Sequence, residues 1–129
     1  MEYPEDLRYT KEHEWARLEE DGTVVFGITE YASHNLGDIV FVEFPEKNAK
    51  ITKSVACGVV ESVKAVADLF SPVSGTVLEV NSMLATSPEI IGEDPYGEGW
   101  FVRCELADKK DFELLMNKAE YENYLSELD

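Results

Sequence analysis

"GVVESVKAVADLFSPVSG", residues Gly58 to Gly75, contains two short runs of apolar and β-branched residues separated by a single cation, Lys64. Runs of this composition and length predict β-strands. Because only a few residues separate the two runs, the segment predicts an antiparallel hairpin. A two-residue turn at Lys64 and Ala65 would put the lysine at the apex of that hairpin. The rest of the chain is interpreted from this hairpin outward.

The two-residue turn fixes an expected register. The expected partners are Val60 with Leu69, Val59 with Phe70 and Glu61 with Asp68. Apolar pairs favour this register, but the facing carboxylates oppose it, and Lys-Ala is not the Asn-Gly or Asp-Gly that tight hairpins prefer. Such local conflict is typical of functional sites. The plainer alternative is that Lys64 is a solvated charge that partly neutralises the two acids.

Further strands are expected on both sides of this hairpin. Two apolar runs joined across Asp21-Gly22 predict a second hairpin. Thr29 is an expected helix cap and Gly37 an expected helix end, which predicts a short helix between them. The remaining expected strands are residues 37–44, 76–80 and 100–106. Asp108 and Asn117 are expected caps of two C-terminal helices, the second with Glu120 at capping-box spacing.

A faint internal repeat sets the expected architecture. "GDIVFVEF" from Gly37 and "GTVLEVNS" from Gly75 share a pattern of glycine followed by alternating apolar residues. Two similar halves predict a mainly β fold, a sandwich or flattened barrel. We find no linker and no second domain, so residues 1–129 are expected to form one domain.

Composition narrows the classes of partner. Eleven basic residues face 27 acidic ones, for a formal net charge of −16. A polyanion gains nothing from covering phosphates, so nucleic acid and anionic membranes are not expected partners, whereas basic protein surfaces are. No leader, transit peptide or membrane-spanning run is found. We therefore expect a cytoplasmic monomer, with Cys57 and Cys104 as small buried strand residues.

Motifs for catalysis are incomplete. "HEWAR" at His13 has arginine where a second zinc-binding histidine would be needed, and "SPVSG" lacks the first glycine of a nucleophile elbow. "GEDPYGEGW" is interpreted only as an exposed, turn-rich loop. The sequence therefore predicts a protein that does no chemistry of its own and holds no metal.

The segment "GVVESVKAVADLFSPVSGTVLEVN" resembles the lipoyl-attachment segment of the glycine cleavage system H proteins. The resemblance extends, in order, over "LRYTKEHEW", "GITEYASHNLGDIVFVEFPE", "IIGEDPYGEGW" and "AEYENYL". It implies a lipoyl/biotinyl-domain-like fold of two similar halves, with added short helices that include a C-terminal pair.

The resemblance also implies roles for four residues. Lys64 matches the lysine that carries (R)-lipoate in amide linkage, and Glu61 matches an acidic residue that lipoate-attaching enzymes read. Glu14 and Asp68 match polar residues of a cleft that receives the loaded arm. The implied partners are glycine decarboxylase, which is a PLP enzyme, an aminomethyltransferase and dihydrolipoamide dehydrogenase.

The implied function is a carrier that moves the aminomethyl group of glycine between these enzymes. An alternative keeps the arm but makes the protein an H-like lipoate relay for other lipoyl acceptors. A biotinyl carrier is disfavoured because Val63 and Ala65 stand where such carriers have methionines. An interaction module without any arm also stays open.

Overall fold

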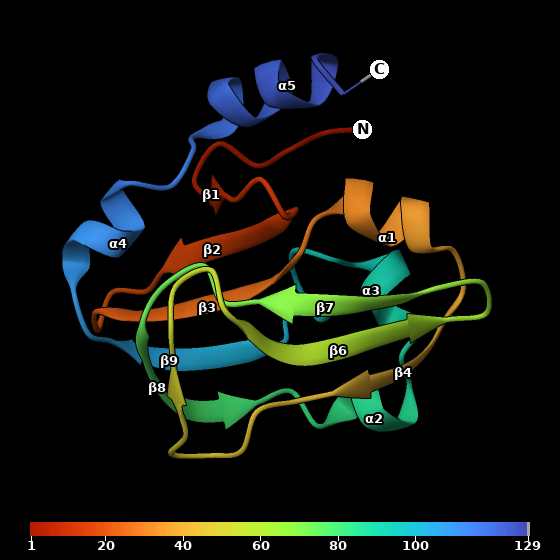
Figure 1. Cartoon of the computed structure of the whole chain (residues 1–129), viewed down its shortest axis with the longest axis horizontal. Coiled ribbons are helices and arrows are strands. Elements are labelled where there is room, and N and C mark those ends of the chain that lie inside the picture. Colours follow the sequence, from red (N-terminus) through yellow and green to blue (C-terminus); the bar gives the residue numbers. More distant parts are fainter. Residues whose placement is uncertain (129) are drawn as a thin grey trace.

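The computed structural model describes residues 1–128, and Figure 1 shows their arrangement. The chain is mainly β, with nine strands and five short helices in the described part. The strands are β1 (Arg8–Tyr9), β2 (Glu14–Leu18), β3 (Thr23–Ile28), β4 (Ile39–Glu43), β5 (Lys50–Ile51), β6 (Ala56–Ser62), β7 (Val66–Phe70), β8 (Gly75–Val80) and β9 (Val102–Leu106). The helices are α1 (Glu30–Leu36), α2 (Met83–Thr86), α3 (Ile90–Glu93), α4 (Lys109–Glu113) and α5 (Lys118–Ser126).

The strands form two sheets that face each other. A six-stranded sheet has the order β1-β2-β3-β9-β8-β5, and a three-stranded sheet has the order β4-β6-β7. Neither sheet closes on itself within residues 1–128, so of the two expected forms the flattened sandwich is the one observed. The two segments of the internal repeat contain β4 and β8, which lie in different sheets.

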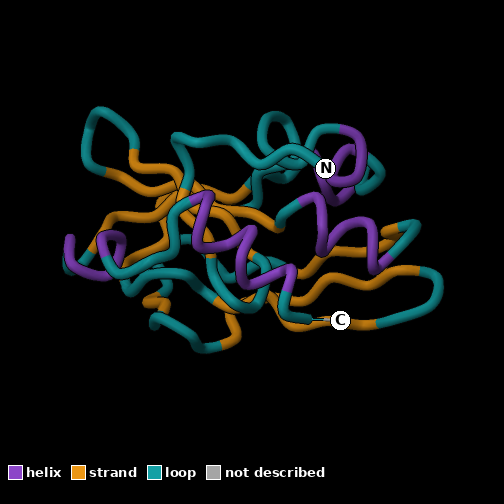
Figure 2. The backbone as a smooth tube through the Cα atoms, turned by 90° about the horizontal axis from the view of Figure 1, so that it is seen from above, coloured by secondary structure: helices purple, strands orange, loops and turns teal. Residues whose placement is uncertain are grey.

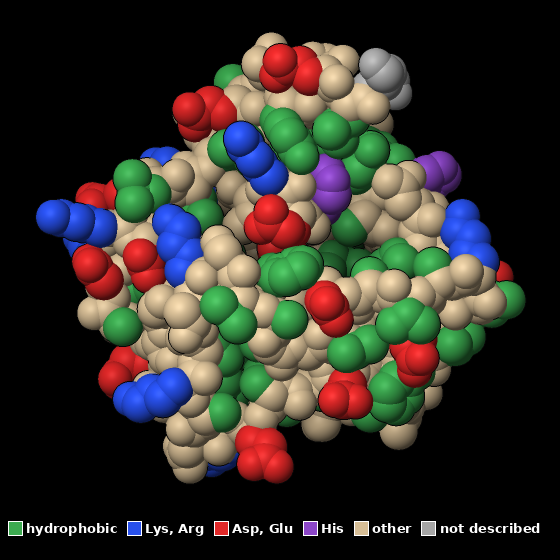
Figure 3. Space-filling view, viewed as in Figure 1, with side chains coloured by type: hydrophobic (Ala, Val, Ile, Leu, Met, Phe, Trp, Pro, Cys, Tyr) green, Lys and Arg blue, Asp and Glu red, His purple; other side chains and the backbone are tan. Residues whose placement is uncertain are grey.

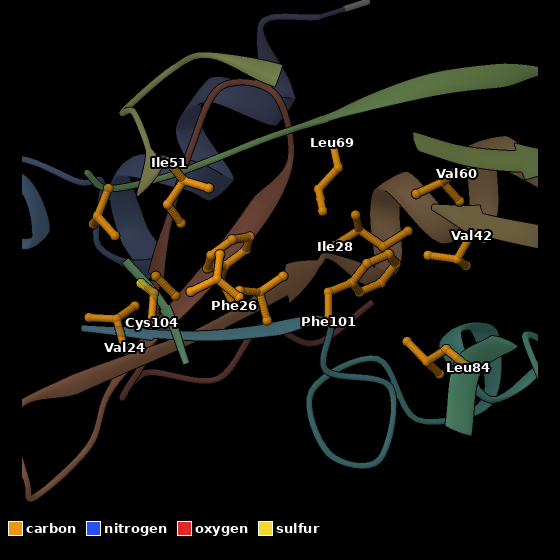
Figure 4. Close-up of a cluster of buried hydrophobic side chains, with 14 of the residues drawn as sticks. Val24, Phe26, Ile28, Val42, Ile51, Val60, Leu69, Leu84, Phe101 and Cys104 are labelled. Carbon is orange, nitrogen blue, oxygen red and sulfur yellow. The ribbon is translucent and has the colours of Figure 1, made fainter. Parts of the chain in front are cut away.

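The core lies between the sheets. Inward side chains of both sheets pack together there, as the close-up in Figure 4 shows; among them are Phe26, Val60, Leu69, Phe101 and Cys104. Burial of such side chains is the main stabilising term of a fold. Cys104 is buried as expected, but Cys57 is only half-buried, because it occupies an irregularity where β6 loses register with β7.

The hairpin around Lys64 forms, but the predicted register is wrong. The observed partners are Glu61 with Val66, Val60 with Ala67, Val59 with Asp68 and Gly58 with Leu69. Each of these β6 residues pairs two positions away from its predicted partner on β7. Because side chains alternate with a period of two, each still lies on the predicted face of the sheet. Three residues, 63–65, connect the two strands, and Glu61 does not face Asp68. The predicted like-charge conflict is therefore absent.

The expected helices are confirmed with their caps. The Thr29 hydroxyl accepts from the Ala32 amide at the start of α1, and Gly37 ends that helix with φ 81°. Asn117 and Glu120 form a reciprocal capping box at the start of α5. In contrast, α2 and α3 were not predicted. The loop that follows them is not fully exposed either, because Pro95 is buried and its carbonyl accepts from the Trp15 indole.

Helix α5, near the C-terminus, packs against the N-terminal segment of the chain. It lies along the N-terminal segment in Figure 1, and Figure 2 shows it from above. Tyr121 of α5 stacks on Tyr9 with ring centroids 4.7 Å apart and meets Tyr3 edge-on. Aromatic contacts of this kind contribute beyond the area they bury. They hold α5 beside the turn that leads into β2, which carries one of the candidate site residues.

Candidate functional site

Lys64 lies in the exposed turn between β6 and β7, at the tip of the hairpin. Ser62 closes this turn. Its backbone amide donates to the Ala65 carbonyl at 2.8 Å, and its hydroxyl oxygen accepts from the amides of Lys64 and Ala65 at 3.3 and 3.0 Å. Because a side chain accepts from these amides, the turn forms without Asn-Gly. The result is a hydrogen-bonded turn on which Lys64 is exposed.

The lysine stem lies beside the end of α1. A side-chain carbon placed on Gly37 would stand 3.6 Å from Cε of Lys64. Next to this contact is a cavity of about 390 Å³, and its lining includes the carboxylate residues Asp38, Glu89 and Glu93. The three acidic residues thus line a cavity that shares Gly37 with the Lys64 contact.

Glu14 is the first residue of β2, and it is almost completely buried, with 1% of its surface exposed. The Thr10 hydroxyl donates to its Oε1 at 2.6 Å, and the backbone amide of Phe70 donates to its Oε2 at 3.3 Å. Thr10 lies in the turn between β1 and β2 of the six-stranded sheet, and Phe70 lies in β7, an edge strand of the other sheet. The Glu14 carboxyl therefore bridges the two sheets.

Burial controls the charge of Glu14. Desolvation raises the pKa of its carboxyl from 4.5 to about 8, although the hydrogen bonds from Thr10 and from the Phe70 amide lower it and Glu12 raises it slightly. Loss of hydration disfavours the ionised form most. In the protein as described, Glu14 is accordingly a mainly neutral acid at pH 7. A cation arriving at its carboxyl would favour ionisation.

The distance along β7 relates Glu14 to Lys64. Val66 follows the turn and Phe70 ends the strand, and four residue steps of about 3.3 Å separate them by about 13 Å. A lysine acylated with a chain of lipoate length spans on the order of 10–15 Å by bond-length arithmetic. An arm folded back along β7 would therefore end near the Phe70 amide, where the Glu14 carboxyl lies.

The other two predicted residues lie on the hairpin itself. Asp68 is exposed on β7, opposite Val59, and Glu61 is half-buried on β6, opposite Val66. Asp68 precedes Phe70 by two residues, so it lies between Lys64 and Glu14 along the strand. Three of the four residues thus lie on the hairpin, and the Glu14 carboxyl, which is 1% exposed, reaches it from the other sheet through the Phe70 amide.

The sequence reasoning missed Thr10 and His13. Thr10 accepts from the Glu14 amide at 3.0 Å as well as donating to its carboxyl. His13 has a positive φ of 74°, and its Nδ1 lies 2.9 Å from the Tyr121 hydroxyl. That hydroxyl in turn contacts Thr29 at 2.8 Å. The only sequence signal was the spacing of four residues between Thr10 and Glu14, which becomes informative once the turn between β1 and β2 is known.

A second cavity, of about 230 Å³, lies near this turn. Lys11, Glu12 and Lys53 are among the residues that line it, so its wall carries charges of both signs.

An exposed lysine at the tip of a hairpin, on a flattened β-sandwich, defines the class of swinging-arm carrier domains. The family model for "Glycine cleavage H-protein" matches residues 7–128. The glycine cleavage system H protein of Anaeromyxobacter sp. (strain K) is 52% identical over 127 residues, covering 98% of each chain. That of Halothermothrix orenii is 49% identical over 129 residues, covering 100% of each chain.

A solved structure agrees with these relatives. The crystal structure of a glycine cleavage system H protein from Mycobacterium marinum superposes with a TM-score of 0.89 at 37% identity, covering 96% of this chain and 99% of that one. The chain belongs to the glycine cleavage H-protein family. The resemblance seen in the sequence is thereby confirmed, as is the prediction of a carrier rather than a catalyst.

Two further observations bear on chemistry and membranes. Burial raises the pKa of both the Cys57 and Cys104 thiols to about 12, so neither is a ready nucleophile. No helix within residues 1–128 has the length and apolar character needed to cross a bilayer.

Proposed function

We propose that residues 1–129 form one carrier domain of the glycine cleavage system, with (R)-lipoate joined to Lys64 by an amide bond. The observation that carries this proposal is the exposed Lys64 amine on a hydrogen-bonded hairpin turn, in a chain of the H-protein family. When bound, the group supplies a strained disulfide that can be reduced and can carry a one-carbon amine on sulfur.

The proposed cargo is the aminomethyl group of glycine. It would pass from the PLP-dependent glycine decarboxylase to the aminomethyltransferase, and dihydrolipoamide dehydrogenase would reoxidise the dithiol. Tethering keeps the reactive group at high effective concentration wherever the carrier docks. We propose a cytoplasmic monomer, loaded by lipoate-attaching enzymes that read Glu61 three residues before Lys64.

Glu14 and Asp68 would protect the cargo between enzymes. Both lie within reach of an arm folded along β7, and both offer carboxyl oxygens to a protonated amine. Glu14 would ionise as the cationic amine approaches, since a nearby positive charge lowers a carboxyl pKa. The low exposure of Glu14 means that side chains around it must move to admit the amine, and closing over it would exclude water.

Two experiments test this function. Intact mass after expression with lipoate and a ligase should show a single adduct, and Lys64→Arg should show none. Reconstitution with glycine decarboxylase should then support glycine-dependent exchange of carbon dioxide. An adduct without exchange would favour the lipoate relay, and no adduct at all would favour an interaction module without an arm.

The role of the two carboxyl groups is tested on the isolated loaded protein. Glu14→Gln and Asp68→Asn should each speed loss of the aminomethyl group. A matched control removes charge from the acidic cavity beside Lys64 through the double variant Glu89→Gln and Glu93→Gln. Unchanged lifetimes in the first two variants, or a shortened lifetime only in the control, would reject the assignment.

A further inference from the structure

The outer face of the three-stranded sheet is not covered by any helix in the view of Figure 1. Backbone pairing aligns its side chains in two rows across β4, β6 and β7. The rows are Phe41–Glu61–Val66 and Glu43–Val59–Asp68. The row between them, which includes Val42 and Val60, is buried in the core, so the two rows point outward. We call these six residues the checkerboard face.

Several apolar side chains on and beside this face are strongly exposed. Phe41 is 47% exposed and Val66 is 66% exposed, and the adjoining Val40 and Val63 are 55% and 77% exposed. Apolar and acidic side chains alternate over this part of the molecule in Figure 3. Single apolar residues on a surface are ordinary, but here four strongly exposed apolar side chains lie near one another among carboxylates, a mixture that protein–protein interfaces use.

Charge determines which partner fits. Three of the six side chains are carboxylates, and none is a cation. Lys64 is the only basic residue from β6 to the end of β7, and acylation would remove its charge. A second copy of this chain, with its own net charge of −16, would be repelled. A basic surface would be attracted.

We propose that the checkerboard face is the docking surface for a protein whose active-site entrance combines a basic rim with exposed apolar side chains. This inference rests on the proposed function, because it assumes that an arm on Lys64 must enter such a site. The face adjoins the turn that bears Lys64, so a partner seated on it would have its entrance at the root of the arm. Apolar contacts would supply affinity, and carboxylates would orient the encounter.

The test measures a bacterial glycine decarboxylase, with the lipoylated carrier as the varied substrate of carbon dioxide exchange. The double variant Phe41→Ser and Val66→Ser removes apolar contacts, and Leu114→Ser, at a residue that is 73% exposed outside the face, is the matched control. Each protein is checked by intact mass for complete lipoylation. The same preparation of decarboxylase is used in every assay, and its activity with free lipoic acid is measured as a reference that does not depend on the carrier.

We expect kcat/KM to fall about tenfold or more in the double variant, mainly through KM, and to change less than about twofold in the control. Raising salt from about 50 to about 500 mM should lower the wild-type value about tenfold. Glu43→Lys should reduce the value at low salt and flatten that dependence.

The outcomes separate the two proposals. If the wild-type carrier supports no exchange, the proposed function fails. If it supports exchange and the double variant matches it, the docking surface is overturned while the function stands. Sedimentation equilibrium provides a further check, because a concentration-dependent wild-type dimer that the double variant abolishes would assign the face to a second copy and overturn the proposal.

Discussion

The buried carboxyl of Glu14 predicts an unusual dependence of stability on pH. Its pKa is about 8 in the folded protein and 4.5 in its ordinary state. Between about pH 4.5 and about pH 8, the folded protein therefore keeps the Glu14 proton, whereas the unfolded chain releases it. Stability is fully present below about pH 4.5, falls as the pH rises, and stops falling above about pH 8. The slope approaches about 1.4 kcal/mol per pH unit within this window.

Glu14→Gln should remove this slope. The glutamine amide cannot ionise, its carbonyl can still accept from the Phe70 amide, and the Thr10 hydroxyl can accept from its NH₂ group. At about pH 5 the variant and the wild type should have similar free energies of unfolding. Above about pH 8 the variant should be more stable by roughly 5 kcal/mol, the product of the pKa difference and about 1.4 kcal/mol per unit.

Urea unfolding followed by tryptophan fluorescence, at intervals from about pH 5 to about pH 9, measures this difference directly. Burial lowers the pKa of His13, and its contribution has the opposite sign, because stability is lost as the pH falls. Both proteins contain His13, so its contribution cancels in the difference. A difference between the two proteins that stays constant from about pH 5 to about pH 9 would refute the buried, neutral Glu14.

Three other predictions concern the supports of the site. Thr10→Val should raise the Glu14 pKa further, seen by ¹³C NMR of the carboxyl, and cost about 1–2 kcal/mol of stability, whereas Thr10→Ser should restore both. Ser62→Ala should cost about 1 kcal/mol and speed hydrogen exchange of the two turn amides it binds; unchanged exchange would contradict its role. Gly58→Ala should cost about 1–3 kcal/mol in urea unfolding, because its new carbon would lie 2.5 Å from the Glu43 carbonyl oxygen.

Local patterns in the sequence predicted most of the fold. Strand composition, the Asp21-Gly22 turn and the helix caps at Thr29 and Asn117 each act over a few residues, and all four are confirmed. The one-turn helices α2 and α3 were missed because neither has a side-chain cap hydrogen bond at its start. Helices this short depend on tertiary packing more than on sequence pattern.

The register of the Lys64 hairpin illustrates a different limit. Alternation of side chains fixes the face of a strand but not which of two registers, two residues apart, is adopted. Two features favour the observed register: the Ser62 hydroxyl, which accepts from two amides in the turn, and the irregularity at Cys57. The burial of Glu14 could not be predicted from local pattern either, because its hydrogen bond to the Phe70 amide joins residues 56 positions apart in the sequence.

In the proposed function, charge would link the hairpin, the buried acid and the cargo. Acylation would remove the one cation of the hairpin, near a cavity lined by Asp38, Glu89 and Glu93. An empty arm is then uncharged, and Glu14 can stay neutral and buried without a partner charge. A cargo amine would bring one positive charge to the end of that arm, and ionisation of Glu14 would compensate it. The raised pKa that costs stability at alkaline pH would thus let the carrier distinguish a loaded arm from an empty one.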